Sequence, residues 1–258
     1  MDLSIVIPVR NEAGNIAPLV AEIGGALDGK TDYEIIYVDD GSTDASAAEI
    51  MRLQADNTRL RLVRHAKSCG QSAAIRSGVK AARAAWIATL DGDGQNDPGD
   101  LPALWQIAQA SPPSPPLLIA GHRARRRDSA TKRHVSKIAN SVRRAMLHDD
   151  TPDTGCGLKL FPRALYLDLP FFDHQHRFLP ALALREGGIV RSLPVNHRPR
   201  ERGASKYGVL DRLWVGIVDL FGLMWLRRRK TVPVLIDDAP IAAAAPRPSK
   251  TAPADPVA

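Results

Sequence analysis

One stretch decides the fold of this chain: Trp86-Ile-Ala-Thr-Leu-Asp-Gly-Asp-Gly-Gln-Asn-Asp-Pro98. Its apolar first half predicts a buried strand, which ends abruptly in Asp91 and Asp93, each followed by a glycine. The strand therefore places two carboxylates on the rim of a sheet. With Gln95 they offer three oxygen donors on one loop, a ligand set that suits a divalent cation such as Mg²⁺ or Mn²⁺. An acidic surface turn is the alternative, because Asp-Gly pairs are common turn residues.

The sequence on the amino-terminal side of this stretch alternates between apolar and helical patterns. Apolar runs predict strands at residues 3–8, 33–39, 60–64 and 86–90, and helical periodicity predicts helices at 15–27, 45–54 and 71–84. Such alternation predicts an α/β fold with a mostly parallel central sheet flanked by helices. Ligands of these sheets bind beyond the carboxyl ends of the strands. Those ends carry Arg10 with Glu12, Asp39 with Asp40, and Asp91 with Asp93.

The composition is that of a soluble globular protein with one main domain. The chain has 258 residues, of which 44% are hydrophobic and 24% charged, enough to bury one sizeable core. No apolar run reaches the ~18 residues of a membrane span, and the chain enters its first strand without a basic leader. Cys69 and Cys156 form neither a disulfide framework nor a zinc-binding spacing. These features favour a cytoplasmic protein.

Six blocks of the sequence stand out together. They are Ile7-Pro-Val-Arg-Asn-Glu12, Val38-Asp-Asp-Gly-Ser-Thr-Asp44, Asp91-Gly-Asp-Gly-Gln-Asn-Asp-Pro98, Gly121-His-Arg123, Asp153-Thr-Gly-Cys-Gly157 and Arg202-Gly-Ala-Ser-Lys-Tyr207. Together they resemble glycosyltransferase family 2, and within it the polyprenyl-phosphate hexosyltransferases, the group of dolichyl-phosphate mannosyltransferase. The resemblance covers roughly residues 1 to 230 in a consistent order. It implies a GT-A fold, a UDP- or GDP-sugar donor, Mg²⁺ or Mn²⁺, and an inverting transfer to a polyprenyl (dolichyl or undecaprenyl) phosphate.

The resemblance also implies roles for individual residues. The donor-binding positions of the family match Pro8, Arg10, Glu12, Val38, Asp40, Asp91 and Gly92. Its metal positions match Asp91, Asp93 and Gln95. Its basic positions near the diphosphate and the incoming phosphate match Arg123, Arg202 and Lys206, which together with Asp93 form the expected catalytic set. Lys132 and Ser136 fall in the expected acceptor site.

The nature of the acceptor decides whether the reaction needs a base. A phosphate is already ionised at neutral pH, whereas a hydroxyl must lose its proton, usually to a carboxylate. The acceptor side of the sequence is rich in arginine, and Asp153 is the one candidate base. Alternatively, Asp153 is a turn residue before Thr154. A family 2 enzyme that glycosylates a hydroxyl of a saccharide or lipid, in cell-envelope or lipopolysaccharide synthesis, therefore stays open. Cys156 is expected to be a small buried packing residue.

The sequence disfavours several other classes of protein. It contains no Gly-x-Gly-x-x-Gly dinucleotide fingerprint. Residues 121–147 hold nine Lys/Arg and one Asp, a surface that faces anions. A nucleic-acid-binding protein is the alternative from another class. No aromatic residue is interleaved with these cations, as stacking on bases requires, so no nucleic-acid partner is expected.

The C-terminal region predicts a membrane-surface element. We expect a catalytic domain at 1–206, an amphipathic helix at 207–230 and a disordered Pro/Ala-rich tail at 231–258. An apolar helical face beside the cations 227–230 suits a helix lying on the inner face of the cell membrane. A helix packed on the domain's own core is the alternative. The apolar face comprises Leu210, Trp214, Ile217, Phe221, Met224 and Trp225.

Overall fold

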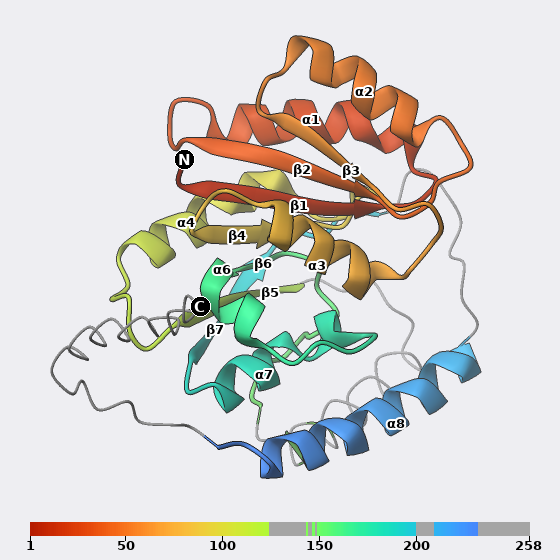
Figure 1. Cartoon of the computed structure of the whole chain (residues 1–258). Helices are drawn as coiled ribbons and strands as arrows, with labels where there is room; N and C mark the ends of the chain where they lie inside the picture. Colours follow the sequence, from red (N-terminus) through yellow and green to blue (C-terminus); the bar gives the residue numbers. More distant parts are fainter. Residues whose placement is uncertain (124–142, 144–145, 148, 200–208, 232–258) are drawn as a thin grey trace, which may run out of the picture.

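The computed structural model describes residues 1–123, 143, 146–147, 149–199 and 209–231 (Figure 1). Four predicted site residues lie outside this part of the chain, namely Lys132, Ser136, Arg202 and Lys206. The predicted tail lies almost entirely outside it as well. The roles expected for these residues therefore stay predictions.

A seven-stranded sheet in the order β3-β2-β1-β4-β6-β5-β7 forms the centre of the molecule. Strand β6 runs antiparallel to β4 and β5, and the other neighbouring strands are parallel. The predicted mostly parallel sheet is thus confirmed. The strands are β1 (Leu3–Val9), β2 (Tyr33–Asp39), β3 (Leu60–Arg64), β4 (Trp86–Thr89), β5 (Leu117–Arg123), β6 (Lys159–Pro162) and β7 (Ile189–Val195).

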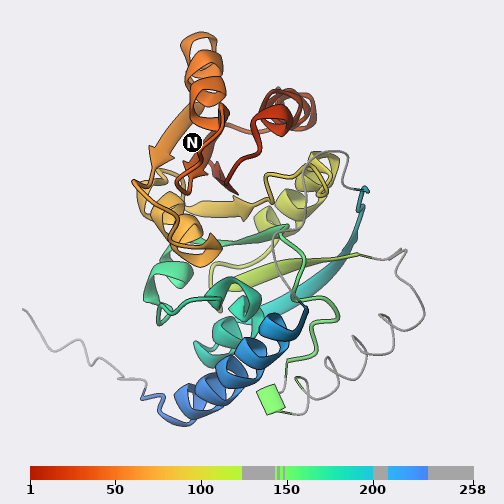
Figure 2. The ribbon, with the colours of Figure 1, turned by 90° about the vertical axis from the view of Figure 1, so that its right-hand side faces the viewer.

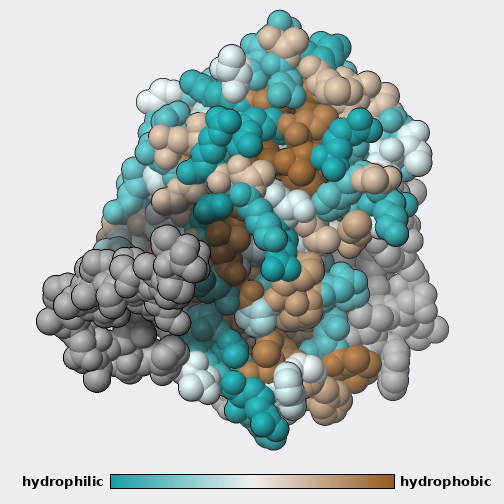
Figure 3. Space-filling view, in the orientation of Figure 1, coloured by the Kyte–Doolittle hydropathy of each residue, from teal (hydrophilic) through white to brown (hydrophobic). Residues whose placement is uncertain are grey.

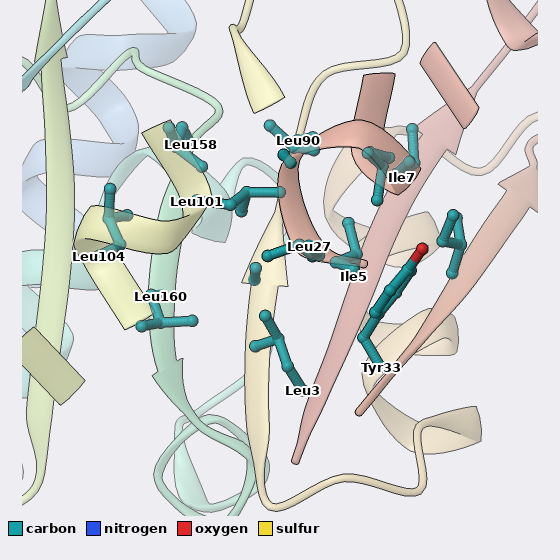
Figure 4. Packing of buried hydrophobic residues seen from close by; sticks show 14 of the residues in the cluster. Leu3, Ile5, Ile7, Leu27, Tyr33, Leu90, Leu101, Leu104, Leu158 and Leu160 are labelled. Atoms are coloured by element: carbon teal, nitrogen blue, oxygen red, sulfur yellow. The ribbon is translucent and has the colours of Figure 1, made fainter. Parts of the chain in front are cut away.

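Helices cover both faces of this sheet. Because side chains alternate along a strand, Ile5 and Ile7 of β1 join one apolar core and Val6 joins the other. The first core includes side chains of α1 and α4, as Figure 4 shows around Ile5, Leu27 and Leu104. The second includes side chains of α3, α6, α7 and α8. The helices are α1 (Ala13–Leu27), α2 (Ser46–Asp56), α3 (Gln71–Ala81), α4 (Leu101–Gln109), α6 (Arg163–Asp168), α7 (Leu179–Arg185) and α8 (Val209–Arg228), with short 3-10 helices η1 (Pro98–Asp100) and η2 (Gln175–Arg177).

The register of the parallel strands aligns their carboxyl ends. Leu3 of β1 pairs with the first residue of β2 and with the first residue of β4. At the other end, Val9 lies beside Asp39. The chain segments that follow β1, β2 and β4 therefore leave the sheet at one edge, which brings the predicted charged pairs together.

Helix α3 is shorter than predicted, because tertiary hydrogen bonds end it. The helical pattern predicts residues 71–84, but the helix stops at Ala81. Beyond it, the backbone N–H of Arg83 donates to Glu34 Oε1 (2.7 Å) and that of Ala84 donates to Ser4 Oγ (3.1 Å). Both acceptors lie on neighbouring strands, so the local sequence carries no sign of them.

Helix α8 has features of both predictions made from its sequence, a helix packed on the core and a helix with an exposed apolar face. Leu220, Leu223, Met224 and Leu226 pack against the second core, so one face of the helix belongs to the domain. Met224, which the sequence places on the apolar face of the helix, packs on the core as the alternative prediction expects. Figures 1 and 2 show α8 on the side of the molecule where α7 lies, far from α1 and α2. Another part of its apolar surface stays exposed, as described below. The side chains of Leu210 and Trp214 lie outside the described part.

Candidate active site

A cavity of about 570 Å³ lies at the carboxyl edge of the sheet. Its lining comes from the ends of β1 and β4, the loop before α3, the end of β5, the start of β6 and the segment before α7. The structure thus brings together side chains that are far apart in sequence. Of the predicted site residues, the lining includes Pro8, Arg10, Glu12, Asp40, Asp91, Gly92, Asp93 and Arg123.

Asp91 is held at the floor of this cavity. Gln71 Nε2 donates to Asp91 Oδ1 at 2.9 Å, and the Asp91 backbone N–H donates to Asn96 Oδ1 at 3.0 Å. Burial and the negative charge of Asp93 raise the pKa of Asp91 to about 6, while Lys159 and Arg123 oppose this rise.

Gly157 creates the space for that carboxylate. A Cβ at this position would lie 2.2 Å from Asp91 Oδ2 and 2.3 Å from its Cγ. Both distances are far inside van der Waals contact. Asp91 therefore occupies its observed place only because residue 157 lacks a side chain.

The acidic loop has the chemistry of a divalent cation site. Asp91 and Asp93 line the same cavity, and carboxylate oxygens are the ligands that Mg²⁺ and Mn²⁺ prefer. Asp91 and Asp93 thus fit the metal that the sequence predicts. Gln95 does not line the cavity, and its side-chain nitrogen donates instead to the Arg198 carbonyl oxygen at 3.4 Å. Its role as a further metal ligand stays a prediction.

Asp40 organises the loop before α3. Its two carboxylate oxygens accept hydrogen bonds from His65 Nδ1 (2.8 Å), Ser68 Oγ (2.8 Å), Cys69 N (2.7 Å) and Gly70 N (2.9 Å). Burial acts to raise the pKa of Asp40, but these hydrogen bonds lower it below its usual range. Asp40 therefore shapes the loop that lines the cavity, and a direct bond to the donor stays a prediction.

Val38 occupies a different place from the other predicted donor residues. It is fully buried in the second core and is not part of the cavity lining. Its side chain lies toward α3, 3.0 Å from the position that a Cβ on Gly78 would take. A contact between Val38 and the donor stays a prediction.

Asp153 holds Arg123 in the cavity wall. Arg123 Nε donates to Asp153 Oδ2 at 2.6 Å and Arg123 Nη2 donates to Oδ1 at 2.8 Å. Oδ1 also accepts the backbone N–H of Gly155, so the turn reading of Asp153 fits the structure. Burial acts to lower the pKa of Arg123, but its partner Asp153 raises it above the usual value. The Arg123 guanidinium therefore stays protonated and is fixed in position at the end of β5.

Cys156 is 1% exposed and packs in the first core, as predicted. Burial raises the pKa of its thiol, which keeps the sulfur protonated. This chemistry fits a packing residue.

Three basic lining residues have no counterpart in the sequence predictions: Lys159, His176 and Arg177. Lys159 is 3% exposed, and its Nζ donates to the carbonyl oxygens of Thr154 and Cys156. A lysine in a short strand usually indicates an exposed face, so the sequence around Lys159 does not predict that its side chain is buried. His176 and Arg177 lie just before the apolar helix α7, and this position was the sequence signal that could have identified them as site residues.

Comparison with known proteins places the chain in a family. The family model described as glycosyl transferase family 2 matches residues 4–169. The chain belongs to glycosyl transferase family 2. The predicted resemblance and the prediction of a glycosyltransferase are thereby confirmed.

Two relatives of this family 2 chain carry names of polyprenyl-phosphate enzymes. Dodecaprenyl-phosphate galacturonate synthase of Rhizobium johnstonii is 34% identical over 241 residues, which cover 90% of this chain and 69% of that protein. Undecaprenyl-phosphate 4-deoxy-4-formamido-L-arabinose transferase of Edwardsiella ictaluri is 32% identical over 212 residues, with coverages of 81% and 63%. The chain thus matches about two thirds of the length of these relatives.

A solved structure shows the same fold. Glucosyl-3-phosphoglycerate synthase of Mycobacterium tuberculosis, in complex with Mn²⁺, UDP and phosphoglyceric acid, has a TM-score of 0.65 and 18% identity to this glycosyltransferase. The match covers 90% of this chain and 80% of that chain. The predicted GT-A fold is confirmed. Within the described residues, no helix has both the length and the apolar character that crossing a bilayer requires.

Proposed function

We propose that this family 2 glycosyltransferase transfers a hexose from a UDP- or GDP-sugar to a polyprenyl phosphate at a membrane surface. Asp91 and Asp93 hold Mg²⁺ or Mn²⁺ in this proposal. The names of the two relatives, both of which specify a polyprenyl phosphate, support the choice of acceptor.

The distribution of charge around the cavity is the observation that carries the proposal. The carboxylates among the described lining residues are Glu12, Asp40, Asp91 and Asp93. Asp40 already accepts four hydrogen bonds, Glu12 accepts one from Asn15 at the start of α1, and the other two form the acidic loop.

Another part of the lining, which we call the acceptor side, is cationic. It comprises the end of β5, the start of β6 and residues 176–177, and its charged side chains are Arg123, Lys159 and Arg177. None of the described lining residues in these segments is a carboxylate, and the neighbouring Asp153 is already paired with Arg123. Such an arrangement suits an acceptor that is already an anion and disfavours a hydroxyl acceptor.

The proposed reaction needs no proton transfer. An oxygen of the acceptor phosphate attacks the anomeric carbon, a new carbon–oxygen bond forms with inversion, and the nucleoside diphosphate leaves with the electron pair of the broken bond. Arg123, held by Asp153, binds and orients the acceptor phosphate through a permanent charge with a planar set of donors. When bound, the metal ion would neutralise the charge that collects on the leaving diphosphate.

The exposed face of α8 supports the membrane part of the proposal. Ile217, Val218, Phe221 and Trp225 are 38%, 54%, 61% and 60% exposed. Arg228 and the following Arg229 are exposed at the end of the helix. Figure 3 shows hydrophobic side chains at the surface along the lower edge of the molecule, where Figure 1 places α8. Exposed aromatics beside cations suit an anionic lipid surface, so we place the enzyme peripherally on the cytoplasmic side of the membrane.

The test is a screen of UDP- and GDP-sugars with polyprenyl phosphate and Mn²⁺ or Mg²⁺. Wild type is expected to give a product that mild acid cleaves, because a glycosyl phosphate hydrolyses readily. Asp93→Ala should reduce turnover by at least about a thousandfold, since it removes charge stabilisation from the leaving group. Asp56→Ala, an exposed carboxylate at the end of α2, is the matched control. An acid-stable product, or an active Asp93→Ala variant, would contradict the proposal.

A further inference from the structure

The segment between α6 and α7 reaches into the cavity from the side of α8. Its path depends on a tight turn in which His174 adopts a left-handed conformation with φ of 62°, uncommon for a residue other than glycine. Gln175 is 1% exposed and fixes the turn, because its Nε2 donates to the Pro170 carbonyl oxygen at 3.2 Å. The turn directs the next two residues, His176 and Arg177, to the cavity wall.

His176 is fastened to the first turn of α3. The buried Ser72 Oγ lies 2.7 Å from His176 Nδ1 and also accepts the backbone N–H of His176 at 3.2 Å. Ser72 directly follows Gln71, which donates to Asp91. This short series of contacts links the segment to the floor of the site. Burial and the nearby charge of Lys159 lower the pKa of His176 to about 3, so its ring is neutral and binds through hydrogen bonds alone.

Arg177 adds a permanent charge beside this imidazole. A guanidinium stays protonated at every physiological pH, and its planar fork of donors matches two oxygens of a phosphate. Arg177 belongs to the cationic acceptor side of the cavity, together with Arg123 and Lys159. A phosphate monoester there would meet fixed donors on more than one side.

The other end of the segment is attached to α8. His174 Nδ1 lies 3.2 Å from Asp219 Oδ2, and the Asp219 side chain is 17% exposed. Burial raises the pKa of Asp219, whereas the neighbouring His174 and Arg177 act to lower it. Asp219 is thus electrostatically coupled to both residues. On the same helix, two positions from it in either direction, Ile217 and Phe221 are exposed to solvent.

We infer that Arg177 and His176 bind the phosphate of the lipid acceptor, and that the Asp219–His174 pair positions them relative to α8. This inference rests on the proposed function and names the residues that receive its acceptor. A lipid chain that lies along the exposed face of α8 would carry its phosphate past Asp219 to the cationic side of the cavity. The Asp219–His174 pair would then fix the position of Arg177, which binds the phosphate, relative to α8, which contacts the membrane.

The test separates acceptor binding from donor binding. We would measure KM for farnesyl phosphate, a short water-soluble acceptor, and Kd for UDP with Mn²⁺, in wild type, Arg177→Met and Arg177→Lys. Arg177→Met is expected to raise KM for the acceptor by roughly ten- to a hundredfold, the usual effect of losing a charged hydrogen bond. Arg177→Lys should recover part of this loss, because it keeps the charge without the planar fork. Arg52→Met, a surface cation on α2 paired only with Glu49 in the described contacts, is the matched control.

The positioning pair is tested by a double-mutant cycle. Asp219→Asn and His174→Gln should each raise KM for farnesyl phosphate severalfold, with an unchanged Kd for UDP, and the double variant should be no worse than either single one. Circular dichroism would check that α8 remains folded. Additive effects, or effects on the donor alone, would overturn the positioning role.

The possible outcomes distinguish the inference from the function on which it rests. If wild type transfers no sugar to any polyprenyl phosphate, the proposed function fails. If wild type transfers sugar but Arg177→Met keeps a normal KM for farnesyl phosphate, the inference alone fails. If Arg177→Met weakens UDP binding and leaves the acceptor KM unchanged, Arg177 binds the donor diphosphate and the inference is wrong.

Discussion

Replacing Gly157 by alanine tests the geometry of the acidic loop with one methyl group. The new Cβ would lie 2.2 Å from Asp91 Oδ2, whereas carbon and oxygen atoms in contact stay about 3.3 Å apart. The carboxylate must therefore move by roughly 1 Å, and a displacement of that size at a reacting centre costs on the order of a hundredfold in rate. The backbone φ of Gly157 lies outside the left-handed region, so alanine causes no backbone strain there.

Stability and activity should respond differently to this substitution. The atoms that clash belong to the end of a side chain, which can rotate away. The free energy of unfolding should therefore change by less than about 1 kcal/mol. The assay is the Mn²⁺-dependent transfer rate, with urea unfolding as the check on folding. Gly25→Ala in α1 is the control, because no atom lies within 4 Å of its added Cβ; it should keep full activity. A folded Gly157→Ala variant with wild-type kcat/KM would show that the position of the Asp91 carboxylate does not set the rate.

Three further predictions concern stability and membrane binding. The pKa of His176 is about 3 in the folded protein, against 6.5 for an unperturbed histidine, so the unfolded state binds the additional proton and stability falls as pH drops through 6.5 toward 3. Between pH 7 and pH 5 this amounts to about 2 kcal/mol, and urea unfolding of His176→Gln should show a pH dependence smaller by that amount; an unchanged pH dependence would contradict the pKa assignment. Asp153→Ala should lower the unfolding free energy by about 3 kcal/mol, because it leaves the Arg123 charge without its buried partner; an unchanged denaturation midpoint would show that the pair has no structural role. The Phe221→Ala/Trp225→Ala double variant should bind anionic vesicles at least about tenfold more weakly with unchanged folding, since it removes exposed apolar area. Binding is measured by co-sedimentation of the protein with the vesicles, and Met51→Ala on α2, which also removes an exposed apolar side chain, is the control. Equal binding of the double variant and wild type would contradict the membrane role of α8.

The sheet edge could be predicted because local sequence determines it. Strands β2 and β3 have the predicted bounds, since each is a short apolar run closed by polar residues. Parallel strands align their carboxyl ends, so the residues that follow β1, β2 and β4 had to meet at one edge. The acidic loop reaches the cavity for this reason. Arg123 reaches it at the end of β5, which runs in the same direction as β4 because both are antiparallel to β6.

The acceptor side could not be predicted, because tertiary contacts assemble it. Strand β6 has four residues, one of them Lys159, and the sequence did not predict it. Its antiparallel insertion between β4 and β5 is what buries this lysine under the cavity. His176 reaches the same cavity through a left-handed turn and a hydrogen bond to Ser72, 104 residues away in sequence. No periodicity or spacing in the sequence encodes that contact.

In the proposed mechanism the acceptor reacts as a preformed anion and needs no base. The decisive measurement compares transfer from one nucleotide sugar, with Mn²⁺, to farnesyl phosphate and to farnesol, which differ only in the phosphate. We expect product from farnesyl phosphate and none from farnesol at any pH at which the protein is folded. Comparable rates with the two acceptors would contradict this mechanism.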